Sequence, residues 1–250
     1  MLNENTIYCG DCIEIIGEIP DNTVDCVITS PPYCVGKEYE AELHIDTYED
    51  FIYRVMCAIK RVLKDDGRIC WNVPYQMYTK EMVKEVSQWA ITYNALTRAG
   101  LCIRDNITWE QNNSDNDTAW GSFASASAPW LRHQTEAIIV AYNNQWKKQH
   151  KGISTITNAE FMKYVIDIWK MPTARRIGHP APYPLELPNR CIKLFTYQND
   201  LVLDPFAGSG TTCLAAKQLN RRYIGIDKIE KYCDIARERL SQTQIPFESE

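Results

Sequence analysis

Residues 27–33 read VITSPPY, in which a strand-like run enters Ser30-Pro31-Pro32-Tyr33. Two consecutive prolines hold the backbone extended and remove two N–H donors, so the nearby carbonyls point outward without competing donors. The Ser30 side-chain oxygen and the Pro31 carbonyl could therefore accept the two N–H groups of an exocyclic base amine. Tyr33 could stack on the face of an extruded base. The alternative interpretation is a rigid turn with a tyrosine in the core.

A second candidate site is the Gly-rich segment LVLDPFAGSGTT at 201–212, which leads into a helical pattern. A strand, an acidic residue, a Gly-rich turn and a helix bring backbone N–H groups close to a ligand at the carboxyl end of the strand. Gly208 and Gly210 would permit that turn, and a P-loop is excluded because no lysine follows Gly210. About twenty residues further on, YIGID ends in Asp227, the spacing of a carboxylate that binds ribose hydroxyls. A helix N-cap is the alternative role for Asp227, but the two segments together predict a nucleoside cofactor.

These two segments need a scaffold of alternating strands and helices. Short β-branched runs predict strands at 24–29, 67–73, 101–109, 135–142, 200–204 and 223–227. Helical patterns lie between them, at 46–64, 80–99, 184–198, 210–220 and 228–241, with a short one around 158–169. The alternation predicts an α/β fold with a doubly wound, mostly parallel sheet. Two regions break it: 111–130 is polar and reads as a long loop, and 143–182 is irregular.

Composition sets the broad class of the protein. The chain has 250 residues, 45% hydrophobic and 24% charged, which suits one large domain over 1–250. No apolar stretch is long enough to span a bilayer and the N-terminus lacks a secretory leader, so we expect a cytoplasmic location without a membrane partner. The net charge of -5 argues against strong non-specific DNA affinity, but it leaves room for a local basic patch.

Ten cysteines in a chain of this length, without a leader, favour buried thiols over disulfides. Six of them lie in apolar runs and are expected to be small buried hydrophobes: Cys26, Cys57, Cys70, Cys102, Cys191 and Cys213. Cys9 and Cys12 form a lone CxxC with no second pair or histidine at ligand spacing, so we expect no metal site.

The order of the motifs resembles the amino-methylating DNA methyltransferases of the β arrangement, in which the catalytic motif precedes the cofactor loop. That family has [DNS]PP[YFW] for catalysis and DPFxGSGT for the cofactor, and the sequence has both, at Ser30 to Tyr33 and at Asp204 to Thr212. IYCGDCIEII, which contains Asp11, resembles the family segment that supplies an acid to the cofactor adenine. The stretch 179–196 resembles the motif that closes over the methionine end, and 108–113 and 132–143 also have family counterparts.

This resemblance implies the S-adenosylmethionine-dependent methyltransferase fold, S-adenosylmethionine as cofactor and no metal. It implies catalysis by Ser30, Pro31, Pro32 and Tyr33. It also implies a set of cofactor-binding residues, namely Asp11, His179, Pro180, Asp204, Phe206, Gly208, Ser209, Gly210, Thr211 and Asp227.

The target base follows from the same resemblance. Members with SPP[YF] mostly methylate N4 of cytosine, whereas those with [DN]PPY mostly methylate N6 of adenine, and this sequence has SPPY. In addition, adenine-type members tend to carry Gln-Lys at the positions that Pro182 and Tyr183 occupy here. We therefore expect N4 of cytosine, with N6 of adenine as the main alternative. Modification of RNA or of a protein amide, and a non-catalytic nucleic-acid-binding module, are further alternatives.

Double-stranded DNA is the expected partner, recognised by 143–178 and by a mobile loop at 111–130. Lysine and arginine neutralise phosphates, so the candidate contacts within 143–178 are Trp146, Lys147, Lys148, Lys151, Arg175 and Arg176. Lys37, shortly after the SPPY motif, is a further candidate for a phosphate contact. The alternative is a surface elaboration with a packed tryptophan. The resemblance leaves open two further partners, a second copy of the chain and a cognate restriction endonuclease.

Overall fold

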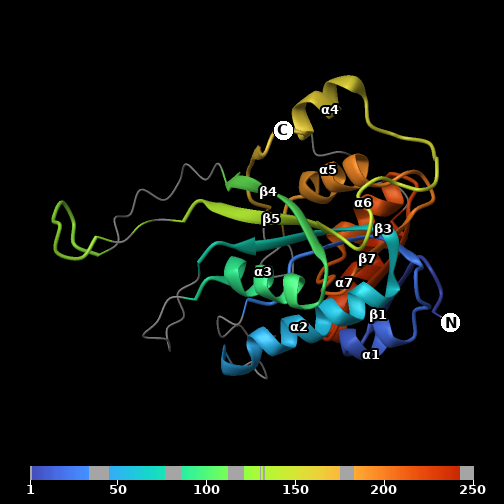
Figure 1. Cartoon of the computed structure of the whole chain (residues 1–250), viewed down its shortest axis with the longest axis horizontal. Coiled ribbons are helices and arrows are strands. Elements are labelled where there is room, and N and C mark those ends of the chain that lie inside the picture. The colour runs from blue at the N-terminus through green and yellow to red at the C-terminus, as the bar shows by residue number, and fades with distance from the viewer. Residues whose placement is uncertain are drawn as a thin grey trace.

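The computed structural model describes residues 2–33, 45–76, 86–111, 121–129, 131, 133–174 and 183–242. Their centre is an eight-stranded sheet in the order β1-β8-β7-β2-β3-β5-β4-β6 (Figure 1). The strands are β1 (Thr6–Cys9), β2 (Val24–Thr29), β3 (Leu63–Pro74), β4 (Cys102–Gln111), β5 (Thr135–Tyr142), β6 (Ile168–Met171), β7 (Leu201–Asp204) and β8 (Arg222–Asp227). Only β5 is antiparallel to its neighbours, β3 and β4, so the prediction of a mostly parallel sheet is confirmed.

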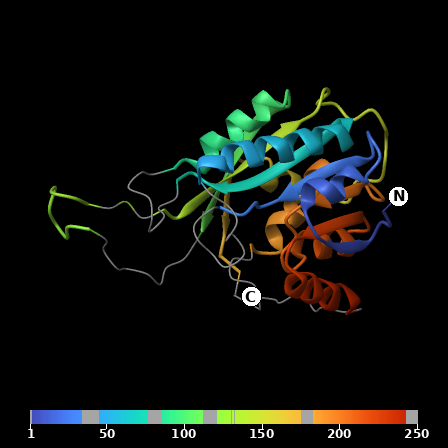
Figure 2. The ribbon, with the colours of Figure 1, turned by 90° about the horizontal axis from the view of Figure 1, so that it is seen from below.

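Helices cover both faces of the sheet, as Figure 2 shows. The first three pack on one face: α1 (Cys12–Gly17), α2 (Ile45–Val62) and α3 (Gln88–Arg98). The other four pack on the opposite face: α4 (Asn158–Tyr164), α5 (Glu186–Phe195), α6 (Thr211–Gln218) and α7 (Glu230–Ser241). Alternate residues of a strand point to opposite faces of the sheet. In β2, Val27 packs in the core under α1 to α3, whereas Cys26 and Ile28 pack in the core under α4 to α7. This is the three-layer arrangement that a parallel sheet buried on both faces requires.

The chain winds in opposite directions from β2 and β7, which are neighbours in the sheet. From β2 it passes through α2 to β3, whereas from β7 it passes through α6, on the other face, to β8 on the other side. The strand order therefore reverses between β2 and β7. Ligands of doubly wound folds bind outside the carboxyl ends of the strands at such a switch point.

Two strands and one helix were absent from the predicted elements. β1 and β6 are four-residue edge strands, too short to show a period, and α1 has only six residues. β6 falls at the end of the helical pattern predicted around 158–169, which instead stops at Tyr164. Residues 80–85 of the predicted helix 80–99 lie outside the described residues, and α3 begins at Gln88, capped by the Ser87 side chain.

The predicted burial of the cysteines is correct for four of the six. Cys26, Cys70, Cys191 and Cys213 are buried, and the nine described cysteines are free thiols. Cys57 and Cys102 are exposed, because Cys57 is on the outer face of α2 and Cys102 opens β4. Within the described residues, no helix combines the length and apolar character needed to cross a membrane.

Candidate active site at the carboxyl edge of the sheet

The catalytic and cofactor motifs meet at the carboxyl ends of β2 and β7. The two strands pair in parallel, with Cys26 opposite Val202 and Val27 opposite Leu203, so Ser30 follows one strand where Asp204 ends the other. The Thr29 hydroxyl donates to Asp204 Oδ1 at 2.6 Å, and both side chains are buried. Two segments far apart in the sequence thus form one site at the switch point.

The backbone of the SPPY motif is held from two helices. The Tyr48 hydroxyl of α2 donates to the Pro32 carbonyl at 2.8 Å, and Gln88 Nε2 at the start of α3 donates to the Tyr33 carbonyl at 2.7 Å. No hydrogen bond among the described residues reaches the Pro31 carbonyl, so this acceptor is available to a ligand amine, as the sequence predicts.

The side chains of Ser30 and Tyr33 contact each other, since their hydroxyl oxygens are 2.6 Å apart. The Tyr33 hydroxyl also donates to Glu136 Oε2 at 3.2 Å and accepts from Asn72 Nδ2 at 3.3 Å. Burial, followed by the charge of Glu136, raises the pKa of Tyr33 well above its ordinary value, so the phenol is protonated.

Glu136, Asn72 and Gln111 were not among the predicted site residues. Asn72 Nδ2 donates to Glu136 Oε2 at 2.6 Å, and Gln111 Nε2 donates to Oε1 at 2.9 Å. Asn72 and Glu136 each stand beside an apolar run, which is the one signal in the sequence that could have pointed to them, whereas Gln111 ends the largely polar strand β4 and gives no such signal.

The Gly-rich turn between β7 and α6 depends on two glycines in the left-handed region. Gly208 has φ +50° and Gly210 has φ +78°, and Gly210 forms the N-cap of α6. The Gly208 N–H donates to Asp227 Oδ2 at 2.8 Å, which ties the turn to the end of β8. The turn predicted from the sequence is therefore present.

Two predicted cofactor residues in this turn use their side chains within the protein. Arg239 of α7 donates to the Ser209 hydroxyl at 3.0 Å, to the Ser209 carbonyl at 2.5 Å and to the Thr211 hydroxyl at 3.3 Å. Ser209 and Thr211 are both buried. Their side chains thus anchor the turn on α7, and each hydroxyl, which accepts from Arg239, keeps its own proton to donate.

Asp11 and Asp227 lie side by side at the ends of β1 and β8, because Cys9 pairs with Asp227 and the Gly10 N–H donates to the Asp227 carbonyl at 2.9 Å. Asp11 is the N-cap of α1, and its Oδ1 accepts from two backbone N–H groups. Asp227 accepts from Gly208 and Ile229, although α7 begins only at Glu230. A carboxylate has about four acceptor positions, so both retain capacity for ligand hydroxyl or amine groups.

Asp204 is the most buried acid of the site. Its carboxylate accepts from the Thr29 hydroxyl, the Phe206 N–H at 3.1 Å and the Tyr183 hydroxyl at 3.2 Å, and Tyr183 also bonds to Thr212. Burial raises the pKa of Asp204 to about 6. The ring of Phe206 packs on the other side of the turn, against Phe51 and Trp71.

Three carboxylates at one edge, Asp11, Asp204 and Asp227, take part in no ion pair among the described residues. A buried carboxylate without a cation is costly, and a positively charged ligand would lower that cost. These three carboxylate acceptors therefore fit a nucleoside that carries a sulfonium and an ammonium group.

The basic run 147–151 lies at the opposite edge of the sheet. β5 is antiparallel, and its last residue, Tyr142, pairs with Arg68 in the middle of β3. The segment that follows continues toward the amino end of β3, where the N–H groups of Asn144 and Gln145 donate to the Asp65 carbonyl. A six-residue strand such as β2 separates the two edges by about 20 Å. Lys147 and Lys151 are exposed at that distant edge, so the structure does not bring them to Ser30.

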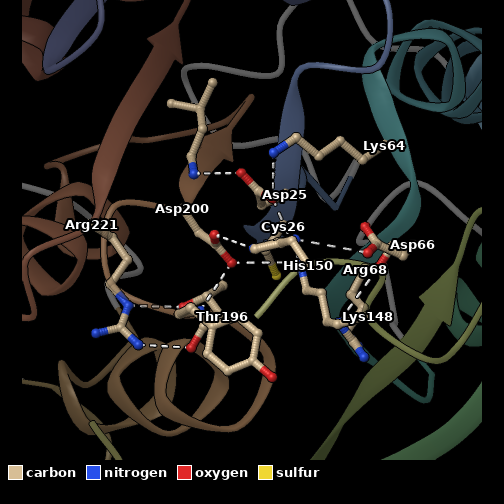
Figure 3. A network of polar contacts seen from close by, with 12 residues as sticks. Asp25, Cys26, Lys64, Asp66, Arg68, Lys148, His150, Thr196, Asp200 and Arg221 are labelled. Carbon is tan, nitrogen blue, oxygen red and sulfur yellow. Dashed lines mark hydrogen bonds and ion pairs between the residues drawn. The ribbon is translucent and has the colours of Figure 1, made fainter. Parts of the chain in front are cut away.

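Lys148 is buried in an ion-pair network, contrary to its predicted role as a DNA contact. Its ammonium lies 3.6 Å from Asp25 Oδ1 and 3.5 Å from Asp200 Oδ2, with only 8% of its side chain exposed (Figure 3). His150 Nε2 lies 3.0 Å from the other oxygen of Asp200. The two buried carboxylates hold the ammonium, which is therefore not free to neutralise a phosphate.

Trp146 packs against the protein, which corresponds to the alternative interpretation of a surface elaboration with a packed tryptophan. Its ring contacts Tyr142 and Phe195, and the guanidinium groups of Arg68 and Arg104 lie 4.7 and 5.2 Å from its centre. The predicted DNA contacts Lys37, Arg175 and Arg176 lie outside the described residues, as do 112–120. The predicted cofactor residues His179 and Pro180 lie outside them too.

The lone CxxC does not form a paired site, because Cys12 is buried in the core while Cys9 is exposed near Glu230 and Cys233. Glu230 in that group is already paired with Arg237. Asp25, His150 and Asp200 form a second group of potential ligands, and there Lys148 supplies the cation.

A doubly wound sheet with a Gly-rich turn, an acid at the next strand and an SPPY turn beside them defines a nucleoside-cofactor enzyme that acts on an amine. Residues 24–238 match the N6_N4_Mtase family model, described as DNA methylase. The chain belongs to this family and is therefore a DNA methyltransferase of the amino-methylating class.

Individual relatives agree with the family match. Type II methyltransferase M.MjaVI of Methanocaldococcus jannaschii is 35% identical over 176 residues, covering 68% of this chain and 87% of that protein. Type II methyltransferase M.BglII of Bacillus subtilis is 29% identical over 95% of this chain and 69% of its own length. TTHA0409 of Thermus thermophilus, solved in complex with S-adenosyl-L-methionine, superposes with a TM-score of 0.76 at 25% identity, covering 94% of this chain and 93% of that one.

Proposed function

We propose that the protein transfers the methyl group of S-adenosylmethionine to the exocyclic N4 amine of cytosine, within a short DNA sequence and after the base has been flipped out of the duplex. The observation that carries this proposal is the hydrogen bond between Thr29 and Asp204, which fixes the amine-binding motif beside the cofactor turn. A base inside the duplex cannot reach such an edge, so the nucleotide must leave the stack.

S-adenosylmethionine supplies an electrophilic methyl group on a sulfonium cation. The carboxylates of Asp11, Asp204 and Asp227 and the backbone of the Gly-rich turn are the groups that would hold it. Ser30 Oγ and the Pro31 carbonyl accept the two amine N–H groups and thereby orient the nitrogen lone pair away from them. Positioning of the amine and removal of water supply much of the rate. The stiff Pro31-Pro32 backbone keeps both acceptors in place.

Support for cytosine comes from Ser30 at the head of the SPPY motif and from Tyr183 in the HPAPYP stretch. Both are typical of the cytosine-N4 members that the sequence resembles. An adenine-N6 enzyme would use the same edge and the same acceptors, and it is the alternative that the experiment below must separate.

DNA contacts are proposed on the segments that leave the carboxyl edge. β4 ends there at Gln111, which pairs with Met171 at the end of β6, so both 111–130 and 172–178 start from this edge. Residues 121–129 form a turn closed by the bridge between Gly121 and Pro129, and Figure 1 shows this turn projecting beyond the strand ends. We retain Arg175 and Arg176 as phosphate contacts and omit 146–151.

A second copy of the chain and a cognate endonuclease remain proposed partners, and sedimentation of the purified protein tests the first of them. The proposed cytoplasmic location follows from the DNA substrate and from the sequence.

The experiment that tests the proposed function is incubation of the purified protein with S-adenosylmethionine and genomic DNA, followed by nucleoside digestion and mass spectrometry. New N4-methylcytosine is the expected product. N6-methyladenine would refute the assignment of the base while keeping the fold, the cofactor and the site. Cofactor binding without either product would refute DNA amine methylation under these conditions and direct the search to RNA or protein amides.

A further inference from the structure

Glu136 occupies a central position in the polar network behind the SPPY motif. It is the second residue of β5 and pairs with Pro74, the last residue of β3, so it lies at the carboxyl edge. Its Oε2 accepts from Asn72 at 2.6 Å and from the Tyr33 hydroxyl at 3.2 Å, and its Oε1 accepts from Gln111 at 2.9 Å. Three strands, β3, β4 and β5, and the SPPY motif that follows β2 therefore contribute to one network.

The orientation of Asn72 in this network is fixed by chemistry. A carboxylate oxygen only accepts hydrogen bonds, so the Asn72 atom 2.6 Å from Glu136 must be the amide nitrogen. The same nitrogen donates its second proton to the Tyr33 oxygen at 3.3 Å. Asn72 is 2% exposed, and reversing its amide would place two acceptors in contact in a buried site.

The direction of the remaining hydrogen bonds follows. Because Glu136 accepts, the Tyr33 hydroxyl donates to it, and the phenol oxygen can then only accept from Asn72 and Ser30. The Ser30 hydroxyl proton therefore points at Tyr33, across the 2.6 Å contact. Both lone pairs of Ser30 Oγ stay available on its other side, which is the state needed to accept an N–H from a base amine.

We propose that Glu136 is a positioning residue for methyl transfer, acting through Tyr33 to keep the Ser30 hydroxyl an acceptor toward the target amine. This inference rests on the proposed function. Without the carboxylate, the Tyr33 proton is free to turn toward Ser30, and the Ser30 proton then turns toward the amine. Two donors would face each other, and the amine nitrogen would lose its fixed orientation.

The test compares Glu136→Gln with wild type in the transfer of tritiated methyl groups from S-adenosylmethionine to DNA. We expect kcat to fall about 10- to 100-fold, while the Kd for S-adenosylmethionine and the KM for DNA stay within about twofold. The matched control is Glu110→Gln on the neighbouring strand β4, whose partly exposed carboxylate pairs with Lys170 of β6 at 3.4 Å. This control should retain wild-type kcat.

The pathway through Tyr33 is tested by a double-mutant cycle. Tyr33→Phe keeps the ring and removes the hydroxyl, so it should lower kcat to a similar extent, and Glu136→Gln in that background should add less than about twofold. Independent, multiplying effects would overturn the proposal, and so would a Glu136→Gln variant that turns over at the wild-type rate. If Glu136→Gln also lowers the melting temperature, the Tyr33→Phe variant decides the question. A wild-type kcat for Tyr33→Phe would then overturn the proposal.

The failure of this inference is separable from failure of the proposed function. Wild-type transfer to DNA with no effect of Glu136→Gln removes only the role of Glu136. No transfer by the wild type to any DNA amine removes both.

Discussion

Thr29 and Asp204 are 175 positions apart in the sequence, and the hydroxyl of the first donates to the carboxylate of the second at 2.6 Å. Thr29 is the last residue of β2 before the SPPY motif, and Asp204 is the last residue of β7 before the Gly-rich turn. This buried contact ties the SPPY motif to the Gly-rich turn, together with the pairing of β2 with β7 and the bond from the Thr212 hydroxyl to the Ile28 carbonyl at 3.3 Å. Tyr183 approaches the second oxygen of the same carboxylate, so the segment that leads into α5 is tied to this contact too.

Thr29→Val should weaken both the fold and cofactor binding. Valine keeps the shape but leaves the buried Asp204 carboxylate without one of its donors, which costs about 1–3 kcal/mol in the free energy of unfolding. The hydrogen bond from Thr29 also lowers the pKa of Asp204, so its loss favours the neutral acid and weakens the binding of a cationic cofactor. Urea denaturation and calorimetric titration with S-adenosylmethionine measure the two effects. Thr6→Val on the edge strand β1 is the control, and a Thr29→Val variant indistinguishable from it would contradict the prediction.

The raised pKa of Asp204 predicts a pH-dependent affinity for the cofactor. Burial raises this pKa to about 6, so the acid is neutral at pH 5 and ionised at pH 8. We expect the Kd for S-adenosylmethionine to rise by up to about tenfold per pH unit below pH 6, because the cation binds the ionised form. Calorimetric titrations between pH 5 and 8 test this, with Asp204→Asn as the control that should bind weakly at every pH. Parallel pH profiles for the two proteins would be the contrary result.

The same shift affects the stability of the ligand-free protein with the opposite sign. A carboxyl whose folded-state pKa lies above its unfolded value binds more protons when folded, so its contribution to stability is present below about pH 4 and lost as the pH rises through 6. For a fully buried group shifted from 3.8 to about 6, the loss is on the order of 3 kcal/mol. The cofactor therefore stabilises the protein most above pH 6.

The meeting of Ser30 with Asp204 could be predicted from the sequence, since both follow strands and the carboxyl ends of parallel strands share an edge. The contact between Glu136 and Asn72 could not, because a polar residue beside an apolar run shows only that it is unusual, and its partner is set by the pairing of β3 with β5. Such pairing joins residues far apart in the chain, and no local pattern encodes it.

Lys148 shows the opposite error, in which a local pattern gives the wrong environment. A run of lysines after a strand resembles a solvated or DNA-binding surface, but the antiparallel direction of β5 carries this run to the amino edge of the sheet. There the buried acids Asp25 and Asp200 require a cation. Both acids were placed within strands from the sequence, yet nothing near them indicated which lysine would neutralise them.

Ser30→Ala should reduce turnover while leaving the cofactor affinity intact. Alanine removes the side-chain acceptor for the amine but keeps the backbone, the Pro31 carbonyl and every group proposed to contact the cofactor. Removal of one preorganised polar group in an active site costs about 100- to 1000-fold in kcat. Transfer assays and calorimetric titration separate the two quantities, with the exposed Ser241→Ala as the control. Equal losses of turnover and cofactor affinity would refute the role given to Ser30.

Lys148→Met should destabilise the protein without changing its interaction with DNA. Removing the ammonium leaves Asp25 and Asp200 with one partner fewer in a buried site, and breaking a buried pair typically costs about 3–5 kcal/mol. His150, which is 40% exposed at its side chain, and Lys64 would compensate only in part. The exposed Lys147→Met and Lys151→Met are matched controls, each expected within about 0.5 kcal/mol of wild type.

Urea denaturation measures the loss in the free energy of unfolding. The salt dependence of DNA binding should keep its slope, because that slope counts the phosphates neutralised. A shallower slope for Lys148→Met with an unchanged free energy of unfolding would restore this lysine to the DNA interface.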